Sequence, residues 1–301
     1  PQIRTDETGR PCVAFTANPN YAARPGKAGL PRIDEIHFVA YNFKDDKDPK
    51  SDHREELAAA LEDGPGRLDV LLDLNAREAA ALAKNAANLR VKLTGRAAPN
   101  RRIYFLAVNN EKSQLNNAAF RCALAYAINR DKLLNDCFRA SPGQDVHTPL
   151  NGPYPVGSWA ANPKLVTTHG DKTTLDPFDL ATAKDKMHQS GVQDATTSLK
   201  YPAGDPVVAR AMSDLAAQVK EAIGVTLELK AVSPNELRDA VERDHNYSLA
   251  YYHYDFPDDV YWLGPLLDGE PKENLLGYNG EKGQLSAMIQ DLSRRLSLIH
   301  I

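Results

Sequence analysis

The stretch at residues 199–232, LKYPAGDPVVARAMSDLAAQVKEAIGVTLELKAV, contains two predicted strands with one amphipathic helix between them. The helix begins at about Pro206 and is expected to end before Gly224, because glycine commonly follows the last turn of a helix. Its apolar stripe consists of Val208, Met212, Leu215 and Val219. The flanking segments, LKYPA and VTLELKAV, have the composition and alternation of strands. Strands that alternate with helices favour an α/β fold with largely parallel sheets.

The same alternation extends through the rest of the chain. Strands are predicted at residues 33–39, 67–72, 102–108 and 247–256. Helices are predicted at residues 53–64, 76–86, 117–138 with a break at Asn129, from Pro177 to Gly191, and from Ser233 onward. The strand RIYFLAV at 102–108 is apolar enough to be buried on both faces. Residues 141–178 are rich in Pro, Gly, Asn and Thr and are expected to be irregular, with Trp159 as an anchor of this long loop.

Composition excludes several classes of protein. The 301 residues are enough for two domains of ordinary size, and a net charge of -4 argues against a nucleic-acid-binding surface. No apolar run approaches the roughly 20 residues that cross a bilayer. The three cysteines are too few for a disulfide framework, and we expect Cys122 and Cys137 to be buried thiols. No spacing typical of zinc ligands occurs, so neither a metal nor a cofactor is predicted.

The segment YYHYDFPDD at residues 251–259 places an acid, Asp255, among aromatic residues at the end of a predicted strand. Strand alternation puts Tyr251, His253 and Asp255 on one face, and Tyr252, Tyr254 and Phe256 on the other. In open α/β sheets, ligands bind beyond the carboxyl ends of the strands. Asp255 is therefore either a ligand contact or the first residue of the turn at Pro257.

Catalytic and metal-binding interpretations of this segment are weaker. His253 and Asp255 lie two residues apart on the strand, and a third metal ligand would have to come from Asp258, Asp259 or His245. Ser248 with His253 and Asp255 has the composition of a hydrolase triad. However, no Gly-x-Ser-x-Gly pattern surrounds this serine, so no catalytic residue is predicted.

Five segments resemble, in order, the family 5 extracellular solute-binding proteins, which include the dipeptide and oligopeptide receptors of ABC importers. The segments are residues 18–42, 59–74, 104–134, 176–192 and 247–267. The third, YFLAVNNEKSQLNNAAFRCALAYAINRDKLL, is similar to a strand followed by a helix that reads Arg-x-Ala-x-x-x-Ala-Ile-Asp-Arg. The chain departs from the pattern at Asn129, where the family has aspartate, and at Asp259, where it has proline. Tyr252 and Tyr254 also replace the usual Trp or Gly.

The resemblance implies a class II periplasmic-binding-protein-like α/β fold, with two lobes joined by crossing strands near residues 103–109. Residues 1–106 would form a partial lobe I and residues 107–301 lobe II. The family's first and last stretches of lobe I have no counterpart in the sequence, so we expect a fragment of a longer protein.

The resemblance also implies a function. A peptide or similar small solute would bind between the lobes and be delivered to an ABC permease in the membrane, without catalysis. The protein would act in the periplasm or outside the cell, either free or held by a lipid anchor. In peptide-binding members, the acid that matches Asp255 pairs with the ligand's amino end. Further candidate contacts are Tyr251, Tyr252, His253, Tyr254, Trp262, Asn109 and Asn110.

Two questions stay open at this point. Asn109 and Asn110 are expected either to contact the ligand or only to bond hinge backbone. The alternative functions are a hydrolase that uses Asp255 and His253, and the cytoplasmic ligand-sensing half of a regulator with the same fold.

Overall fold

The structure is a computed structural model, and it divides the chain into two compact units, Pro1–Arg96 and Ala97–Ile301. It describes residues 2–6, 9–21, 32–39, 61, 67–70, 79–80, 82–83, 101–139, 147–150, 152–161, 167–169, 172–174, 176–257, 261–267 and 274–276. The assignment of residues 1–106 and 107–301 to two lobes stays a prediction.

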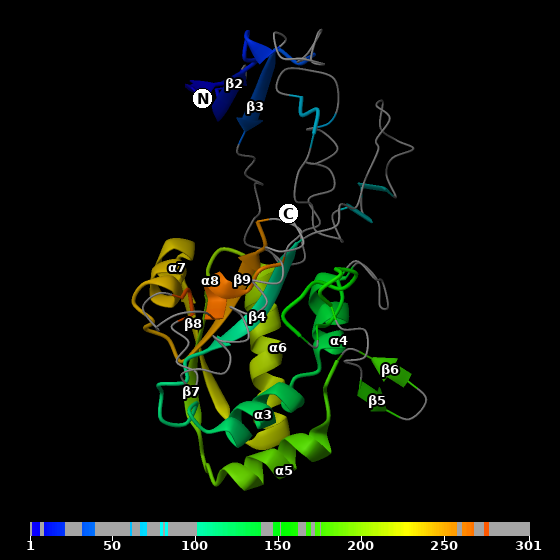
Figure 1. Cartoon of the computed structure of the whole chain (residues 1–301), viewed down its shortest axis with the longest axis vertical. Helices are drawn as coiled ribbons and strands as arrows, with labels where there is room; N and C mark the ends of the chain where they lie inside the picture. Colours follow the sequence, from blue (N-terminus) through cyan, green and yellow to red (C-terminus); the bar gives the residue numbers. More distant parts are fainter. Residues whose placement is uncertain are drawn as a thin grey trace, which may run out of the picture. The chain divides into compact units, whose positions relative to one another are not determined.

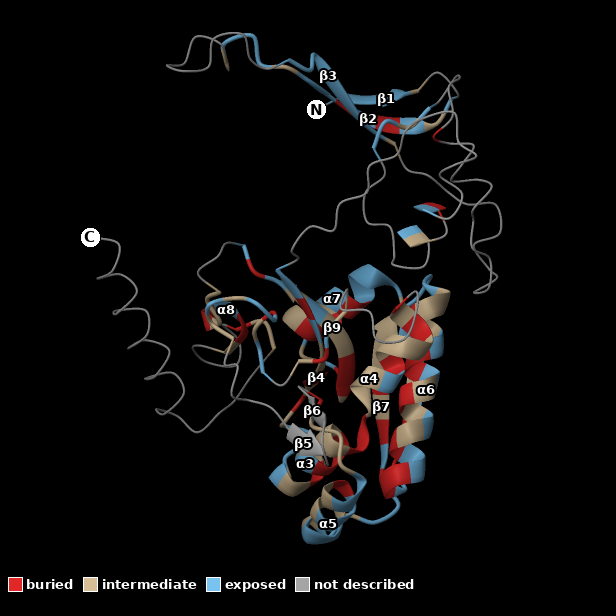
Figure 2. Cartoon of the chain, turned by 90° about the vertical axis from the view of Figure 1, so that its right-hand side faces the viewer, coloured by how far each residue is buried: buried red, intermediate tan, exposed pale blue. Residues whose placement is uncertain are grey.

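The N-terminal unit contains an antiparallel sheet of three strands, in the order β1 (Gln2–Thr5), β2 (Pro11–Thr16) and β3 (Glu35–Val39). Only β3 was predicted. The register places Ile3, Val13 and Phe38 side by side on one face, and Phe15 and Ile36 adjoin them. All five are exposed, and Figure 2 shows much of this sheet in the colour of exposed residues. The opposite face carries the buried Cys12 and Ala14.

The predicted elements at residues 53–86 lie largely outside the described part of the chain. Residues 79–80 and 82–83 are helical, as is Leu61, in agreement with the two predicted helices. Residues 67–70 are not in a strand, so the predicted strand at 67–72 is wrong for those positions.

The C-terminal unit is built on a four-stranded sheet with the order β4-β9-β7-β8. Its strands are β4 (Arg102–Val108), β7 (Thr196–Pro202), β8 (Thr226–Val232) and β9 (Leu249–Asp255). β7 runs parallel to β8 and β9, whereas β4 is antiparallel to β9. Among the described strands, parallel pairing is thus confined to β7, β8 and β9, and the expectation of largely parallel sheets was too broad.

Helices cover both faces of this sheet (Figure 1). They are α3 (Ala118–Ala127), α4 (Arg130–Leu133), the π-helix η3 (Leu134–Phe138), α5 (Leu180–Ser190), α6 (Pro206–Ile223), α7 (Pro234–Glu242) and α8 (Gly264–Leu267). β5 (Thr167–His169) and β6 (Lys172–Thr174) form a hairpin within the segment predicted to be irregular. Among the described residues, no helix combines the length and the apolar character that a membrane crossing requires.

Short polar side chains and glycines set the helix ends where the sequence predicts them. Asp205 accepts hydrogen bonds from the backbone of Val207 and Val208 and so begins α6, and Gly224 ends it in the left-handed conformation. The break at Asn129 is confirmed, because its side chain caps α4 by accepting from the Lys132 backbone at 2.8 Å.

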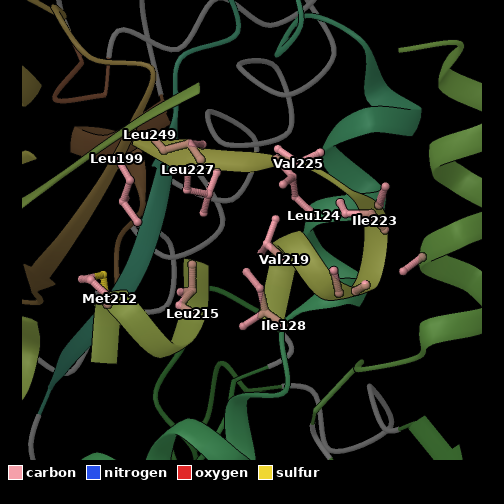
Figure 3. Close-up of a cluster of buried hydrophobic side chains, with 14 of the residues drawn as sticks. Leu124, Ile128, Leu199, Met212, Leu215, Val219, Ile223, Val225, Leu227 and Leu249 are labelled. Atoms are coloured by element: carbon pink, nitrogen blue, oxygen red, sulfur yellow. The ribbon is translucent and has the colours of Figure 1, made fainter. Parts of the chain in front are cut away.

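The larger core lies between the sheet and helices α3, α5 and α6. Figure 3 shows Leu199, Leu227 and Leu249 of the sheet with Met212, Leu215 and Val219 of α6, and Leu124 and Ile128 from the α3 region. A smaller cluster on the other face joins Ala107 and Ala250 of the sheet to α7. Cys137 is buried as expected, but Cys122 is exposed on α3, which corrects that prediction.

Candidate functional site

The candidate site lies where β4 and β9 pair at the carboxyl end of β9. The register sets Arg102 opposite Asp255, Tyr104 opposite His253, and Leu106 opposite Tyr251. Directly opposed residues of an antiparallel pair point to the same face. Arg102, Tyr104, His253 and Asp255 therefore form one polar and aromatic surface, and Tyr251 joins it to the core. We call these five residues the β4–β9 surface.

Asp255 is held by Arg102 through two hydrogen bonds. Arg102 Nε donates to Oδ1 at 2.5 Å and Nη2 donates to Oδ2 at 3.1 Å. These bonds, and a longer one from Nη1 to the Tyr104 hydroxyl, raise the pKa of Arg102. The two side chains are 39% and 50% exposed, and an exposed pair contributes about 1 kcal/mol or less to stability. The pair therefore matters for the charge of this surface more than for the fold.

Aromatic rings flank the ion pair. The rings of Tyr104 and Tyr251 stack with centroids 5.7 Å apart and an interplanar angle of 13°. His253 lies 5.7 Å from the Tyr104 ring, and its Nε2 is 3.6 Å from Asp255 Oδ2. Burial is the main cause that lowers the pKa of His253, and the charge of Arg102 adds to it, against the opposing charges of Asp255 and Glu242. Burial raises the pKa of Tyr251. Both side chains are therefore largely uncharged at neutral pH.

The other aromatic candidates are outside these opposed pairs, although the ring of Tyr252 stacks beside that of His253 with centroids 5.4 Å apart. Tyr252 has the opposite orientation, and its hydroxyl donates to Glu242 of α7 at 2.7 Å. Tyr254 shares that orientation and packs its ring 5.0 Å from the buried Phe256. The indole of Trp262 lies against Gly264, where an added Cβ would come within 2.3 Å of Nε1. The structure thus places Tyr251 and His253 on one face with Asp255, sets the ring of Tyr252 beside that of His253, and packs Tyr254 on Phe256.

Asn109 and Asn110 follow β4 at the end opposite to Arg102, so they are not brought together with Asp255. Asn109 is buried, and its side-chain amide both donates and accepts a hydrogen bond with backbone groups. Nδ2 donates to the His245 carbonyl at 2.9 Å, and Oδ1 accepts from the Glu111 backbone at 3.0 Å. These bonds agree with a backbone-bonding role for Asn109, the second of the two alternatives left open by the sequence.

Arg102 and Tyr104 were not predicted as site residues. Their own strand was predicted with the observed bounds, but its partner was not. Tyr104 is 51% exposed, because β4 is an edge strand among the described strands and one of its faces is open at this end, whereas Ile103 on the other face is buried. The expectation that residues 102–108 are buried on both faces is therefore wrong at this end of the strand. Arg102 becomes recognisable as a site residue only through its partner Asp255, which lies 153 positions later in the chain.

The geometry does not support the catalytic alternatives. Ser248 lies just before β9, at the end opposite to Asp255, so the three residues of the supposed triad are not gathered. Within the described residues, no group of three His, Cys, Asp or Glu side chains could hold a metal ion. Asp258 and Asp259 lie outside the described residues. Trp159 is 63% exposed, and its role as an anchor of the long loop stays a prediction.

Comparison with known proteins identifies a matching family and one curated relative. The profile of the bacterial extracellular solute-binding proteins, family 5 Middle, matches residues 8–274. A probable D,D-dipeptide-binding periplasmic protein, DdpA of Escherichia coli K12, is 23% identical over 198 residues, which are 62% of this chain and 34% of DdpA.

Solved structures share the fold. The oligopeptide-binding protein AppA of Bacillus subtilis, solved with a nonapeptide, matches 96% of this chain and 53% of its own at 15% identity and a TM-score of 0.63. DppA of Helicobacter pylori, solved with the peptide STSA, matches 93% and 48% at 15% identity and a TM-score of 0.64. The chain spans about half the length of these structures, and the expected periplasmic-binding-protein-like α/β fold is confirmed.

Proposed function

The chain belongs to family 5 of the bacterial extracellular solute-binding proteins. We therefore propose that it binds a peptide or similar small solute and delivers this solute to an ABC permease. The match over residues 8–274 is the observation that carries this proposal. In this proposal, the solute binds between two lobes in the periplasm or outside the cell, and hinge closure precedes release to the permease. The binding function named for DdpA and the peptides bound to AppA and DppA support a peptide as the solute.

The β4–β9 surface is the proposed contact on this chain. It offers hydrogen-bonding groups on Arg102, Asp255 and His253, and an aromatic face on Tyr104 beside them. It lies at the carboxyl end of β9, where ligands of open α/β sheets bind. The remaining candidates of the sequence, Tyr252, Tyr254, Trp262, Asn109 and Asn110, are kept as weaker proposals, since they lie outside the opposed pairs that surround Asp255.

The hydrolase alternative is not favoured, because the family consists of solute-binding proteins. The regulator alternative shares the fold, but the matched family is extracellular. A solute that co-purifies with the chain, identified by mass spectrometry, would name the ligand directly.

Calorimetric titration with that solute tests the contact. Asp255→Ala should weaken binding about tenfold or more, which corresponds to about 1.4 kcal/mol. Glu228→Gln, an exposed change on β8 at the other edge of the sheet, is the matched control and should leave the affinity unchanged. Equal affinities of the Asp255→Ala variant and the wild type would remove the β4–β9 surface from the binding site.

A further inference from the structure

The ion pair of the β4–β9 surface bears on which solutes bind there. We infer that Arg102 sets the charge selectivity of this surface by cancelling the charge of Asp255, so that the solute group bound beside Asp255 carries no free ammonium. This inference rests on the proposed function and narrows it to solutes that present a neutral or blocked group at this position.

The pairing is built into the backbone register. Arg102 and Asp255 are directly opposed in the β4–β9 ladder, so the guanidinium needs no rearrangement to reach the carboxylate. Both carboxylate oxygens are used, one by Nε and one by Nη2. A two-pronged pair of this kind has more geometric specificity than a single contact. An incoming ammonium would have to displace Arg102 or share Asp255 with it.

Among the described residues, the other three side chains of the β4–β9 surface add no negative charge to it. Tyr104 is positioned by stacking on Tyr251, and the Arg102 guanidinium donates toward its hydroxyl. His253 is largely neutral, as argued from its burial. The charges of Arg102 and Asp255 cancel, so the five side chains of the surface carry no net charge at neutral pH. Such a surface recognises a solute through hydrogen bonds and contact with ring faces.

Two nearby acids already have partners of their own. Asp205, close to Tyr251, caps α6 by accepting from two backbone N–H groups, where the helix N-terminus favours a negative charge. Glu242 accepts the hydroxyl of Tyr252 on the other face of β9. Neither replaces Asp255 as the partner for an ammonium on this surface.

A matched pair of peptides tests the selectivity by calorimetric titration of the full chain. The probes are tri-alanine and N-acetyl-tri-alanine, which differ in the charge of the amino end. Wild type should bind the acetylated probe at least as tightly as the free one. Arg102→Gln should shift the affinity ratio about tenfold toward the free amino probe, and Arg102→Lys, which keeps the charge but not the two-pronged geometry, should shift it less. An unchanged ratio in Arg102→Gln, or a tenfold wild-type preference for the free amine, would overturn the inference.

A second measurement needs no ligand. Titration of the His253 ring followed by NMR should show a higher pKa in Arg102→Gln, because a nearby positive charge is lost and Asp255 becomes available to the imidazolium. Adding Asp255→Asn to that variant should reverse the rise. A His253 pKa that is unchanged in Arg102→Gln would overturn the claim that Arg102 cancels Asp255. If neither probe binds any form, tri-alanine is excluded as a solute of this chain, while the NMR result still decides whether Arg102 controls the charge.

Discussion

Asp176 joins the beginning of α4 to the segment that leads into α5, and its removal should be costly. Its side chain is 4% exposed. Oδ1 accepts from Arg130 Nη1 and from the Phe178 backbone, both at 3.1 Å, and Oδ2 accepts from the Asp131 backbone at 2.9 Å. The carboxylate therefore satisfies one cation and two backbone donors that water reaches poorly.

The magnitude follows from what Asp176→Ala leaves behind. Each backbone donor that loses its acceptor costs about 1–3 kcal/mol. Breaking a buried ion pair by removing one partner costs about 3–5 kcal/mol, but Arg130 is 29% exposed and can be partly hydrated. We therefore expect Asp176→Ala to lower the free energy of unfolding by about 3–5 kcal/mol in total. Asp176→Asn, which keeps one acceptor oxygen, should lower it less.

Urea unfolding followed by far-UV circular dichroism measures this loss. Asp185→Ala on α5 is the control, because Asp185 is exposed and accepts a hydrogen bond only from Gln189 among the described contacts. Exposed changes of this kind usually stay within about 0.5 kcal/mol. A loss below about 1 kcal/mol for Asp176→Ala would refute the reasoning, since it would mean that the three donors find other partners at little cost.

Three further outcomes are expected. Leu199→Ala, at a fully buried position in the centre of the core, should cost about 2–5 kcal/mol in urea unfolding. Asp205→Ala should cost about 0.5–2 kcal/mol through loss of the α6 cap, whereas Asp205→Asn should stay close to wild type in the same assay. Burial and the charge of Arg139 lower the pKa of His147 in the folded state, so the unfolded state binds more protons just below about pH 6.5. The free energy of unfolding should therefore rise with pH up to that value, and His147→Gln should remove part of this rise. If the free energy of unfolding of His147→Gln depends on pH as in the wild type, the assignment of this rise to His147 is wrong.

Much of the fold follows from local sequence signals. Asp205 and Gly224 bound α6, and Asn129 breaks the preceding helix, because each acts on backbone groups within a few residues. The alternation of Tyr251, His253 and Asp255 was likewise predicted, since side chains of any strand alternate between its faces. These properties do not depend on which element is the neighbour.

The rest depends on contacts between distant residues. No local pattern says that β4 pairs with β9, so Arg102 could not be recognised as the partner of Asp255, although both strands were predicted. The same limit explains the exposure of Tyr104, because burial depends on the position of a strand within its sheet. It also explains why β1 and β2, the other two strands of the N-terminal sheet, were missed.

The order of strands in the four-stranded sheet has a consequence for how the protein acquires its site. β9 is a central strand that separates β4 from β7, and it is the last of the four in the sequence. Chain growth therefore completes β4, β7 and β8 well before the strand that pairs with both β4 and β7 exists. Bringing together residues 153 positions apart requires closure of a long loop, which slows folding. During synthesis, β4 has an unpaired edge in the meantime, and such edges recruit other strands. The nascent chain thus exposes unpaired strand edges until β9, which ends at Asp255, has been added.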